Sequence, residues 1–317
     1  MIKANTDQSQ STFDVFTVAD ICVDMILTGN VRPQFHQVEQ IVDDCSLELG
    51  GSATIFASQL AKLKARVGVI GWVGKDVLGQ FVLQQLAAAG VDTQRVQEHL
   101  AFKTGVGVAL SEKNDRAILT YMGTIDATRP EDLQERWLGD CKHWHIASYF
   151  LLQNMRAIWP DWLAKCRERG ITTSLDTNWD PEARWLGVHE LLPLVDIFLP
   201  NEEEALAISG ERNPFDAGKR LASSGPLVVI KRGENGALAM VKNKTWEFRP
   251  DQTELPSSIV DATGAGDNFD AGFIRGWLLG RDMETCLRLG HRCGLNSLKF
   301  LGGTRGQVVD NVEACQP

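Results

Sequence analysis

Strand and helix signals alternate along most of the chain, and this alternation constrains the fold more than any other feature. Short apolar runs predict buried strands at 13–26, 67–73, 143–147, 172–176, 197–199 and 227–231. Amphipathic runs predict helices at 52–65, 78–89, 154–169, 267–279 and 283–300. Repeated strand–helix units with short connections produce a mainly parallel sheet with helices on both faces. We therefore expect an α/β three-layer sandwich.

Two segments interrupt this rhythm and predict a second, smaller sheet. From about 96 to 126 apolar and polar residues alternate on either side of a polar turn at 112–115, which is typical of a β-hairpin. The irregular segment 28–49 can supply further strands to the same sheet. Because no low-complexity segment or long linker is evident, we expect residues 1–317 to form one domain with the small β-sheet as a lid.

The stretch from Asp261 to Phe269, DATGAGDNF, carries the strongest chemical signal. Two glycines precede a single carboxylate, Asp267, and an amphipathic run follows. This pattern predicts a helix start whose free N–H groups and positive dipole end attract an anion. A carboxylate at such a site needs a chemical role, such as accepting the proton of a hydroxyl that attacks a phosphate. A tight turn followed by an acid that compensates the helix dipole is the structural alternative.

Composition argues against several classes of function. A formal net charge of −9 argues against binding to nucleic acid or to anionic membranes. The polar N-terminus lacks the apolar core of a signal peptide, and no uncharged apolar run approaches the roughly 18 residues that span a bilayer. Seven cysteines without a C-x-x-C pair predict reduced thiols and a cytoplasmic location. His143 and His145, which alternate on one strand, do not form a complete set of metal ligands.

Four motifs, in one order, resemble those of the PfkB (ribokinase-like) family of carbohydrate and nucleoside kinases. They are the glycine pair Gly50-Gly51, the N-x-x-E segment at 199–205, the glycine-containing loop at 228–236, and DATGAGDNF at 261–269. The resemblance runs almost from end to end. It implies a ribokinase-like fold and an ATP-dependent kinase that phosphorylates a primary hydroxyl of a small sugar.

The resemblance also implies the roles of the residues at the transfer centre. Asp267 would be the general base and would contact the sugar hydroxyl. The backbone N–H groups of Gly264, Ala265 and Gly266 would form the anion hole for the charge that develops during transfer.

Further residues would hold the nucleotide and the metal ions. Asn201 and Glu204 would bind Mg²⁺ through water, because magnesium commonly keeps several waters. Carbonyl groups of Asp261 and Thr263 would supply a monovalent cation site, for example for K⁺. The resemblance implies that the residues contacting ATP are Asn201, Lys231, Arg232, Gly233, Gly236, Gly266 and His291.

At the substrate end, the resemblance makes Asp24 the carboxylate that hydrogen-bonds two sugar hydroxyls. Gly50 and Gly51 would leave room for the sugar. Thr104 and Val106 from the hairpin would close over it and exclude water. An exposed hairpin edge also predicts a homodimer through the lid strands.

Some positions depart from the family pattern on the substrate side. Ile55 stands where an asparagine is usual and Cys22 where Asn is frequent, so two polar contacts to the substrate are replaced by apolar groups. We still expect Ile55 to line the substrate site, but the substitutions argue against ribose itself and for a less hydroxylated acceptor. Asp180 argues against a carboxylated sugar, and the lack of an evident Lys or Arg cluster argues against a phosphosugar.

Three alternatives accompany this interpretation. Apolar residues at 22 and 55 also suit the base of a nucleoside, which favours a nucleoside kinase of the same fold. A non-catalytic relative that senses sugar or nucleotide has no use for the Asp267 base. A dinucleotide-binding oxidoreductase requires a G-x-G-x-x-G motif after the first strand, and the sequence has none.

Overall fold

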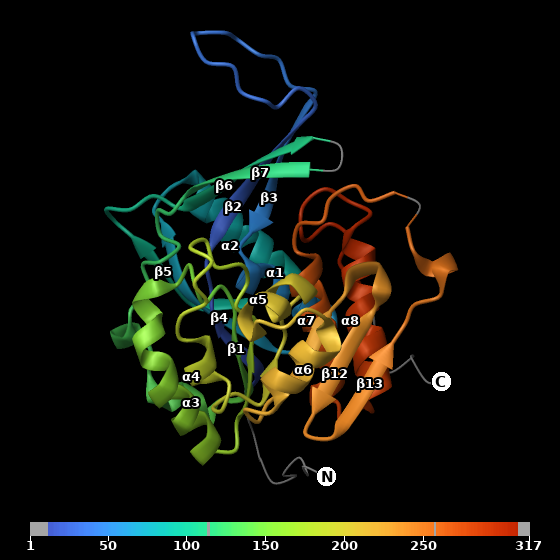
Figure 1. The fold of residues 1–317 in the computed structure, drawn as a ribbon. Helices are drawn as coiled ribbons and strands as arrows, with labels where there is room; N and C mark the ends of the chain where they lie inside the picture. Colours follow the sequence, from blue (N-terminus) through green and yellow to red (C-terminus); the bar gives the residue numbers. More distant parts are fainter. Residues whose placement is uncertain (1–11, 113–114, 257, 310–317) are drawn as a thin grey trace.

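A nine-stranded sheet forms the centre of the computed structural model, which describes residues 12–112, 115–256 and 258–309 (Figure 1). Its strand order is β13-β12-β11-β10-β9-β8-β1-β4-β5, and the strands from β11 to β5 are parallel. The hairpin β12–β13 adds an antiparallel edge that we did not predict. The strands are β1 (Phe13–Val18), β4 (Val67–Gly74), β5 (Asp92–His99), β8 (Cys141–Ile146), β9 (Thr172–Leu175), β10 (Ile197–Phe198), β11 (Leu227–Lys231), β12 (Ala237–Val241) and β13 (Lys244–Phe248).

Helices cover both faces of this sheet, as the βα alternation predicted. One face carries α1 (Ser52–Lys62), α2 (Val77–Ala89), α7 (Ala265–Leu278) and α8 (Met283–Ser297). The other carries α3 (Trp159–Glu168), α4 (Val188–Leu191), α5 (Glu202–Ser209) and α6 (Pro214–Ala222). Short 3₁₀ turns lie at Pro130–Asp132, Glu135–Gly139, Gln153–Ile158, Gly233–Asn235 and Gln252–Glu254. In the part of the chain described, no helix is long and apolar enough to cross a membrane.

Strand alternation divides the interior into two cores, one on each face of the sheet. In β11, Val228 and Ile230 enter the core with α3 to α6, whereas Val229 enters the core with α1, α2, α7 and α8. Trp144 and Trp162 fill the first core and meet edge to face, with ring centroids 5.0 Å apart. The parallel strands are therefore buried on both sides, which explains their continuous apolar runs.

A four-stranded sheet of order β3-β2-β6-β7 lies beyond one end of the central sheet (Figure 1). Its strands are β2 (Cys22–Thr28), β3 (Asp44–Gly50), β6 (Gly105–Glu112) and β7 (Asp115–Tyr121). The predicted hairpin is the antiparallel pair β6–β7. The loop between β2 and β3 projects away from the body of the molecule (Figure 1).

Two strands differ from the boundaries that we expected for this small sheet. The run 13–26 is not one strand: β1 ends at Val18, and β2 begins at Cys22 in the other sheet. The start of the expected segment 96–126 belongs to β5, an edge strand of the central sheet. Both halves of 13–26 are apolar, so composition does not indicate that the chain passes from one sheet to the other between β1 and β2.

Packing between α7 and α8 depends on a glycine. A Cβ atom on Gly272 would lie 2.6 Å from the Leu289 carbonyl oxygen and 2.9 Å from Gly290 Cα. Both are backbone atoms, so a side-chain rotation cannot relieve the contact. Overpacking costs about 1–3 kcal/mol, which exceeds the roughly 1 kcal/mol by which alanine is the better helix former.

We expect Gly272→Ala to lower the free energy of unfolding in urea by about 1–2 kcal/mol because α7 and α8 must separate. The matched control is Gly139→Ala, since a Cβ there meets nothing within 4 Å. It should stay within about 0.5 kcal/mol of the parent protein. Equal stability of the two variants would show that the helix pair relaxes without cost.

Candidate active site

A cavity of about 780 Å³ lies between the four-stranded sheet, the carboxyl ends of the central strands and the start of α7. It brings together most of the residues singled out from the sequence: Asp24, Gly51, Ile55, Asn201, Glu204, Lys231, Arg232, Gly233, Gly236, Thr263, Gly264, Ala265, Gly266, Asp267 and His291. Its wall does not include Gly50, Thr104, Val106 or Asp261. The carboxyl ends of parallel strands are the usual binding edge of such a sheet.

The loop before α7 is held by two side chains. The Asp261 carboxylate accepts hydrogen bonds from Thr263 N (2.9 Å), Thr263 Oγ1 (2.7 Å) and Gly302 N (2.9 Å). Asn268 Nδ2 donates to the carbonyls of Gly264 and Gly303, each at 2.8 Å. Gly264 takes a left-handed conformation with φ of 71°, and the helix begins at the next residue. The start of α7 therefore lines the cavity in a fixed arrangement, with Ala265 N donating to the Ala262 carbonyl at 3.3 Å.

Asp267 lies in the first turn of α7 and is 7% exposed. Burial and the nearby carboxylate of Asp176 raise its pKa to about 8, although Lys231 and a hydrogen bond with the Ser52 side chain act in the opposite direction. A carboxyl group with a pKa near neutrality is suited to gain and lose a proton during a reaction.

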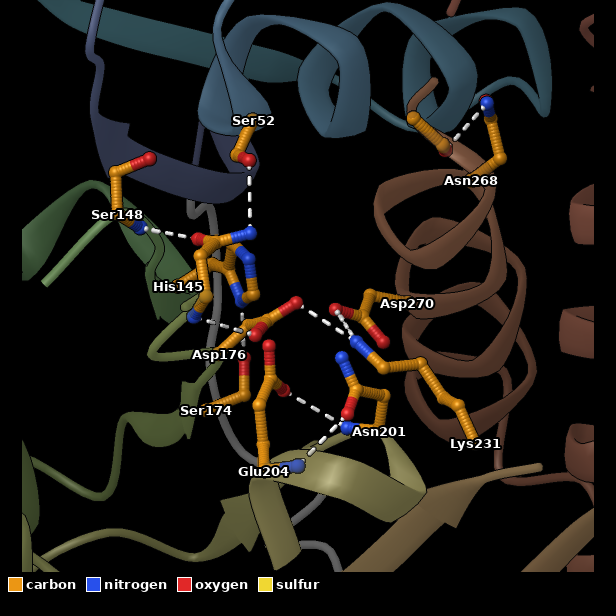
Figure 2. Close-up of polar contacts among 12 residues, drawn as sticks. Ser52, His145, Ser148, Ser174, Asp176, Asn201, Glu204, Lys231, Asn268 and Asp270 are labelled. Carbon is orange, nitrogen blue, oxygen red and sulfur yellow. Dashed lines mark hydrogen bonds and ion pairs between the residues drawn. The ribbon is translucent and has the colours of Figure 1, made fainter. Parts of the chain in front are cut away.

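Lys231 at the end of β11 connects three elements beneath this helix start. Its Nζ lies 2.7 Å from Asp176 Oδ2 and 3.1 Å from Asp270 Oδ2 (Figure 2). Burial opposes the charge of Lys231, but the two carboxylates outweigh burial and raise its pKa. Burial likewise opposes the Asp176 charge, yet Lys231 dominates and lowers the pKa of Asp176 to about 2. A Cβ on Gly266 would be 3.4 Å from Nζ, so the ammonium lies directly behind the helix start.

Asn201 and Glu204 form a reciprocal cap at the start of α5. Asn201 Oδ1 accepts from Glu204 N and Glu204 Oε2 accepts from Asn201 N, both at 2.8 Å. The second carboxylate oxygen of Glu204 points toward Asp176 (Figure 2). Burial and the Asp176 charge raise the pKa of Glu204 to about 7. The acid is thus both a structural cap and a wall of the cavity.

The far end of the cavity has features that fit a nucleotide. His291 is 5% exposed, and its Nε2 has no hydrogen-bond partner among the described residues. Gly236 is required because a Cβ there would lie 2.0 Å from the Phe248 carbonyl oxygen. Arg232 pairs with Glu202 (3.2 Å) and Glu247 (3.0 Å), which fixes its side chain at the rim.

Asp24 occupies the opposite end of the cavity, on β2. A Cβ on Gly50 or on Gly107 would lie 2.5 or 2.7 Å from Asp24 Oδ1, so these two glycines make room for its carboxylate. Burial and the charge of Asp20 raise the pKa of Asp24 to about 7. The space expected beside Gly50 for a substrate is therefore filled by Asp24. The space beside Gly51 is filled by the Asp20 carbonyl oxygen, which would lie 2.1 Å from a Cβ on that glycine.

Thr104 and Val106 do not face the cavity, contrary to our expectation from the sequence. Thr104 is fully buried, and its hydroxyl and N–H bind Asp76 at 2.7 and 2.8 Å. In β6, Val106 pairs with Val23 while Gly107 pairs with Asp24, so alternation turns Val106 to the outer face of the sheet. The small sheet lines the cavity with Gly107, Arg116, Ile118 and Thr120 instead.

Arg116 on β7 was missed by our search for a basic cluster. It hydrogen-bonds Thr263 Oγ1, and its Nη1 lies 3.6 Å from Asp261 Oδ1. The residue thus connects the small sheet to the loop that precedes α7. The alternation of residues along β7 indicates which face of the sheet Arg116 lies on. Nothing near Arg116 in the sequence indicates a partner 147 positions away.

Asp180 does not report on the substrate. Its carboxylate accepts N–H groups of its own loop, from Glu182 (3.0 Å), Arg184 (2.8 Å) and Trp185 (2.7 Å). It is absent from the cavity wall. Our argument from Asp180 against a carboxylated sugar is therefore wrong.

The strand histidines are core residues. His143 Nε2 and His145 Nδ1 each lie 2.7 Å from the Ser174 hydroxyl, and burial lowers both pKa values to about 3. Among residues 12–112, 115–256 and 258–309, no group of three side chains is placed to hold a metal ion by itself.

Comparison with known proteins agrees with this geometry. The family model described as pfkB family carbohydrate kinase matches residues 14–304. An ATP-dependent ribose-1-phosphate kinase from Halopiger xanaduensis is 30% identical over 84% of this chain and 85% of its own length. A cytidine kinase from Thermococcus kodakarensis is 30% identical over 80% and 88%. A putative ribokinase II from E. coli, solved in complex with ATP and Mg²⁺, superposes with a TM-score of 0.83 at 26% identity, covering 95% and 98%.

The match extends over nearly the whole described chain, and the ribokinase-like architecture agrees with it. The chain belongs to the pfkB family and is an ATP-dependent carbohydrate kinase.

Proposed function

We propose that the protein transfers the γ-phosphate of ATP to a primary hydroxyl of a small sugar, with Asp267 as the general base. The observation that carries this proposal is a buried carboxylate in the first turn of α7, at a helix start that lies against the Lys231 ammonium. Asp267 would accept the hydroxyl proton as the oxygen attacks. The burial that raises its pKa to about 8 makes it a competent base near neutral pH.

Fixed hydrogen-bond donors would stabilise the negative charge on the transferred phosphate. Backbone N–H groups of Gly264, Ala265 and Gly266 would form the anion hole, with the helix dipole and the Lys231 charge behind them. Because Asn268 and Asp261 already hold this loop, the donors need no reorganisation during transfer. Two features support adenosine binding at the far end of the cavity. His291 Nε2 has no hydrogen-bond partner among the described residues, and the backbone of Gly233 and Gly236 lines the cavity.

Oxygen donors at the start of α5 fit magnesium. Glu204 directs one carboxylate oxygen into the cavity, and Asn201 lies beside it; this set suits an ion that retains water ligands. Bound Mg²⁺ would neutralise phosphate oxygens and orient them for in-line transfer. A K⁺ site formed by the carbonyls of Asp261 and Thr263 stays a prediction.

The acceptor end combines one polar anchor with an apolar wall. Asp24 would accept hydrogen bonds from two acceptor hydroxyls. Around it, apolar side chains replace polar ones: Cys22, Ile55, Ile118, Ile125, Leu151 and Trp179 line the cavity. This wall also favours a second candidate, a nucleoside acceptor whose base contacts the apolar side chains. The cytidine kinase relative supports that candidate, and the ribose-1-phosphate kinase relative supports a pentose.

We also propose a homodimer and a cytoplasmic location. The outer face of the small sheet exposes apolar side chains, with Leu119 62% and Tyr121 53% exposed, and we infer that a second copy of the chain covers it. Within the described residues, the cysteines at 22, 45, 141, 166 and 286 form no disulfide, which supports a reducing, cytoplasmic location.

We expect Asp267→Asn to lower kcat by about 10²–10⁴-fold while the affinity for ATP stays within about threefold, because only the proton acceptor is lost. Steady-state kinetics and nucleotide titration measure the two effects. Near-parental turnover in this variant would contradict the assignment of the base.

Measuring the free energy of unfolding of the parent and of Asp267→Asn at several pH values tests whether the variant is folded. Burial raises the pKa of Asp267 from 3.8 to about 8, so the folded parent loses stability as pH rises through that window. Asparagine removes this loss, and the variant should be at least as stable as the parent at pH 9.

We expect Asp24→Ala to raise KM for the acceptor by about 10–100-fold, with KM for ATP nearly unchanged, because two charge-assisted hydrogen bonds to hydroxyls disappear. Assaying parent and variant against pentoses, ketohexoses, deoxy sugars and nucleosides identifies the acceptor class at the same time. Asp44→Ala, on the exposed part of β3, is the control. Equal rises in both KM values would remove Asp24 from the acceptor site.

We expect Leu119→Glu to convert a dimer to a monomer, measured by light scattering after gel filtration, because a charge cannot be buried unpaired at an apolar interface. Glu98→Ala, on β5 of the other sheet, should leave the mass unchanged. A parent protein that is monomeric at high concentration would exclude the dimer.

A further inference from the structure

One side chain of β7 connects the small sheet to the loop that precedes α7. Arg116 Nη1 donates a hydrogen bond to Thr263 Oγ1 and lies 3.6 Å from Asp261 Oδ1. The Arg116 side chain is 40% exposed, whereas the Asp261 side chain is only 6% exposed. The guanidinium thus reaches a nearly buried carboxylate from a different part of the fold, and both Arg116 and Thr263 line the cavity.

The direction of each bond in this contact is fixed by chemistry. A guanidinium only donates, so the Thr263 hydroxyl must accept from Arg116 with an oxygen lone pair. The proton of that hydroxyl points to Asp261 Oδ1 at 2.7 Å, and Thr263 N donates to the same oxygen at 2.9 Å. Asp261 Oδ2 accepts from Gly302 N, also at 2.9 Å. The Thr263 hydroxyl therefore transmits the position of Arg116 to the loop.

Arg116 and Asp24 lie on the same face of the small sheet. Asp24 in β2 pairs with Gly107 in β6, and Gly107 pairs with Thr120 in β7. Arg116 comes four residues before Thr120, about 13 Å along the strand, and alternation places both on the cavity side. Because hydrogen bonds between the strands hold the sheet together, a contact that fixes Arg116 also limits where Asp24 can lie.

The other end of the contact lies one residue before the start of α7. Thr263 precedes Gly264, whose φ of 71° is left-handed, and the helix begins at Ala265. A glycine restricts its own backbone little, so its neighbours must set the direction in which the helix leaves the loop. Thr263 and Asn268 do so through their hydrogen bonds. The Arg116 bond therefore acts on the segment that carries the proposed anion hole.

We propose that Arg116 is a positioning residue that holds the small sheet against the loop before α7 and thereby sets the acceptor hydroxyl beside the transferred phosphate. The inference rests on the proposed function, because it connects Asp24, the proposed acceptor anchor, to the proposed anion hole. A misplacement of about 1 Å can lower a rate by about 100-fold. Arg116 therefore affects the rate of transfer without contacting the reacting atoms.

The opposite edge of the small sheet has a separate attachment. Arg305 pairs with Glu48 on β3 and donates to Ser46 Oγ at 2.8 Å. Glu48 also packs against Gly302, where a Cβ would lie 2.6 Å from Glu48 Cγ. Since β3 and β7 are the two edges of the sheet, loss of Arg116 should release the β7 edge while the β3 edge stays attached. A variant that lacks Arg116 should therefore still fold.

Hydrogen exchange of the ligand-free protein tests the contact without an acceptor. Arg116→Met removes the guanidinium and keeps an unbranched side chain. We expect amides in peptides that cover 261–269 to exchange about 3–10-fold faster in this variant, because the loop opens more often. The control is Arg32→Met, since Arg32 pairs with Glu112 at 2.6 Å and its side chain is 82% exposed; its exchange should match the parent. Unchanged exchange at 261–269 in Arg116→Met overturns the inference.

Measuring ADP and phosphorylated acceptor together tests the effect on transfer. The assay uses MgATP with 2-deoxy-D-ribose, D-fructose or cytidine as the probe acceptor. Arg116→Met should lower kcat by about 10–100-fold, with KM for ATP within about twofold of the parent. It should also form ADP in excess over phosphorylated acceptor, because water enters where the β7 edge no longer closes the cavity. Arg116→Lys retains a charged donor and should recover part of the rate.

A double-mutant cycle tests whether Arg116 acts through Thr263. Thr263→Val removes the hydroxyl and keeps the shape of the side chain. In this background Arg116→Met should lose most of its effect on exchange and on kcat, because the bond that transmits the effect is absent. In the Thr263→Ser background, which keeps a hydroxyl, the effect of Arg116→Met should persist. Full additivity of Arg116→Met and Thr263→Val would show that the guanidinium acts by another route and would overturn the inference.

The outcomes separate this inference from the proposed function. An inactive Asp267→Asn together with parental exchange and kcat in Arg116→Met overturns the role of Arg116 and leaves the base intact. Near-parental activity of Asp267→Asn overturns the base, while the exchange measurement still decides the Arg116 contact. A rise in KM for ATP without excess ADP would indicate that Arg116 binds phosphate directly, and faster exchange throughout the chain would indicate a folding role. Either result overturns the inference.

Discussion

The buried ion cluster of Lys231, Asp176 and Asp270 is the interaction on which the geometry of the site depends. Burial disfavours the charged forms of these groups; pairing with Lys231 outweighs that cost for Asp176, whereas the pKa of Asp270 stays raised well above its usual value. Lys231 ends β11, Asp176 follows β9 and Asp270 lies within α7, so the cluster holds these three elements in one relative position. Removing Lys231 would leave two carboxyl groups in the interior without a cation, so the lysine is the member that keeps the start of α7 beside the ends of β9 and β11.

Around this cluster the same residues serve folding and chemistry. Glu204 caps α5 and faces the cavity, Asp20 accepts the first N–H groups of α1, and Asp261 holds the loop that precedes α7. The raised pKa of Asp267 arises from burial among acids that are themselves structural. A site assembled in this way needs few dedicated catalytic groups, because the capping and loop-forming bonds already orient the donors.

Much of the core fold was predictable because strand and helix periodicities are local. The strands at 67–73, 143–147 and 227–231 and the helices at 52–65 and 78–89 appear within a few residues of their expected ends. The elements that were misplaced are β2, β5 and the hairpin β12–β13. Their composition does not say which sheet they join, since the choice depends on where the chain crosses between the sheets.

The proposed transfer motif could also be identified in the sequence, because the proposed anion hole and general base are contiguous within 264–267 and depend on one helix start. The residues at the substrate end of the cavity could not be identified from the sequence. Thr104 and Val106 lie on the wrong face or in the core, while Arg116, Ser52 and Asn178 reach the cavity through pairings across 126 to 147 positions. The sequence alone determined the fold class, the glycine-rich start of α7 and the acid in its first turn. Only the tertiary structure decided which distant side chains surround that acid, because their proximity follows from strand order and register rather than from any local pattern.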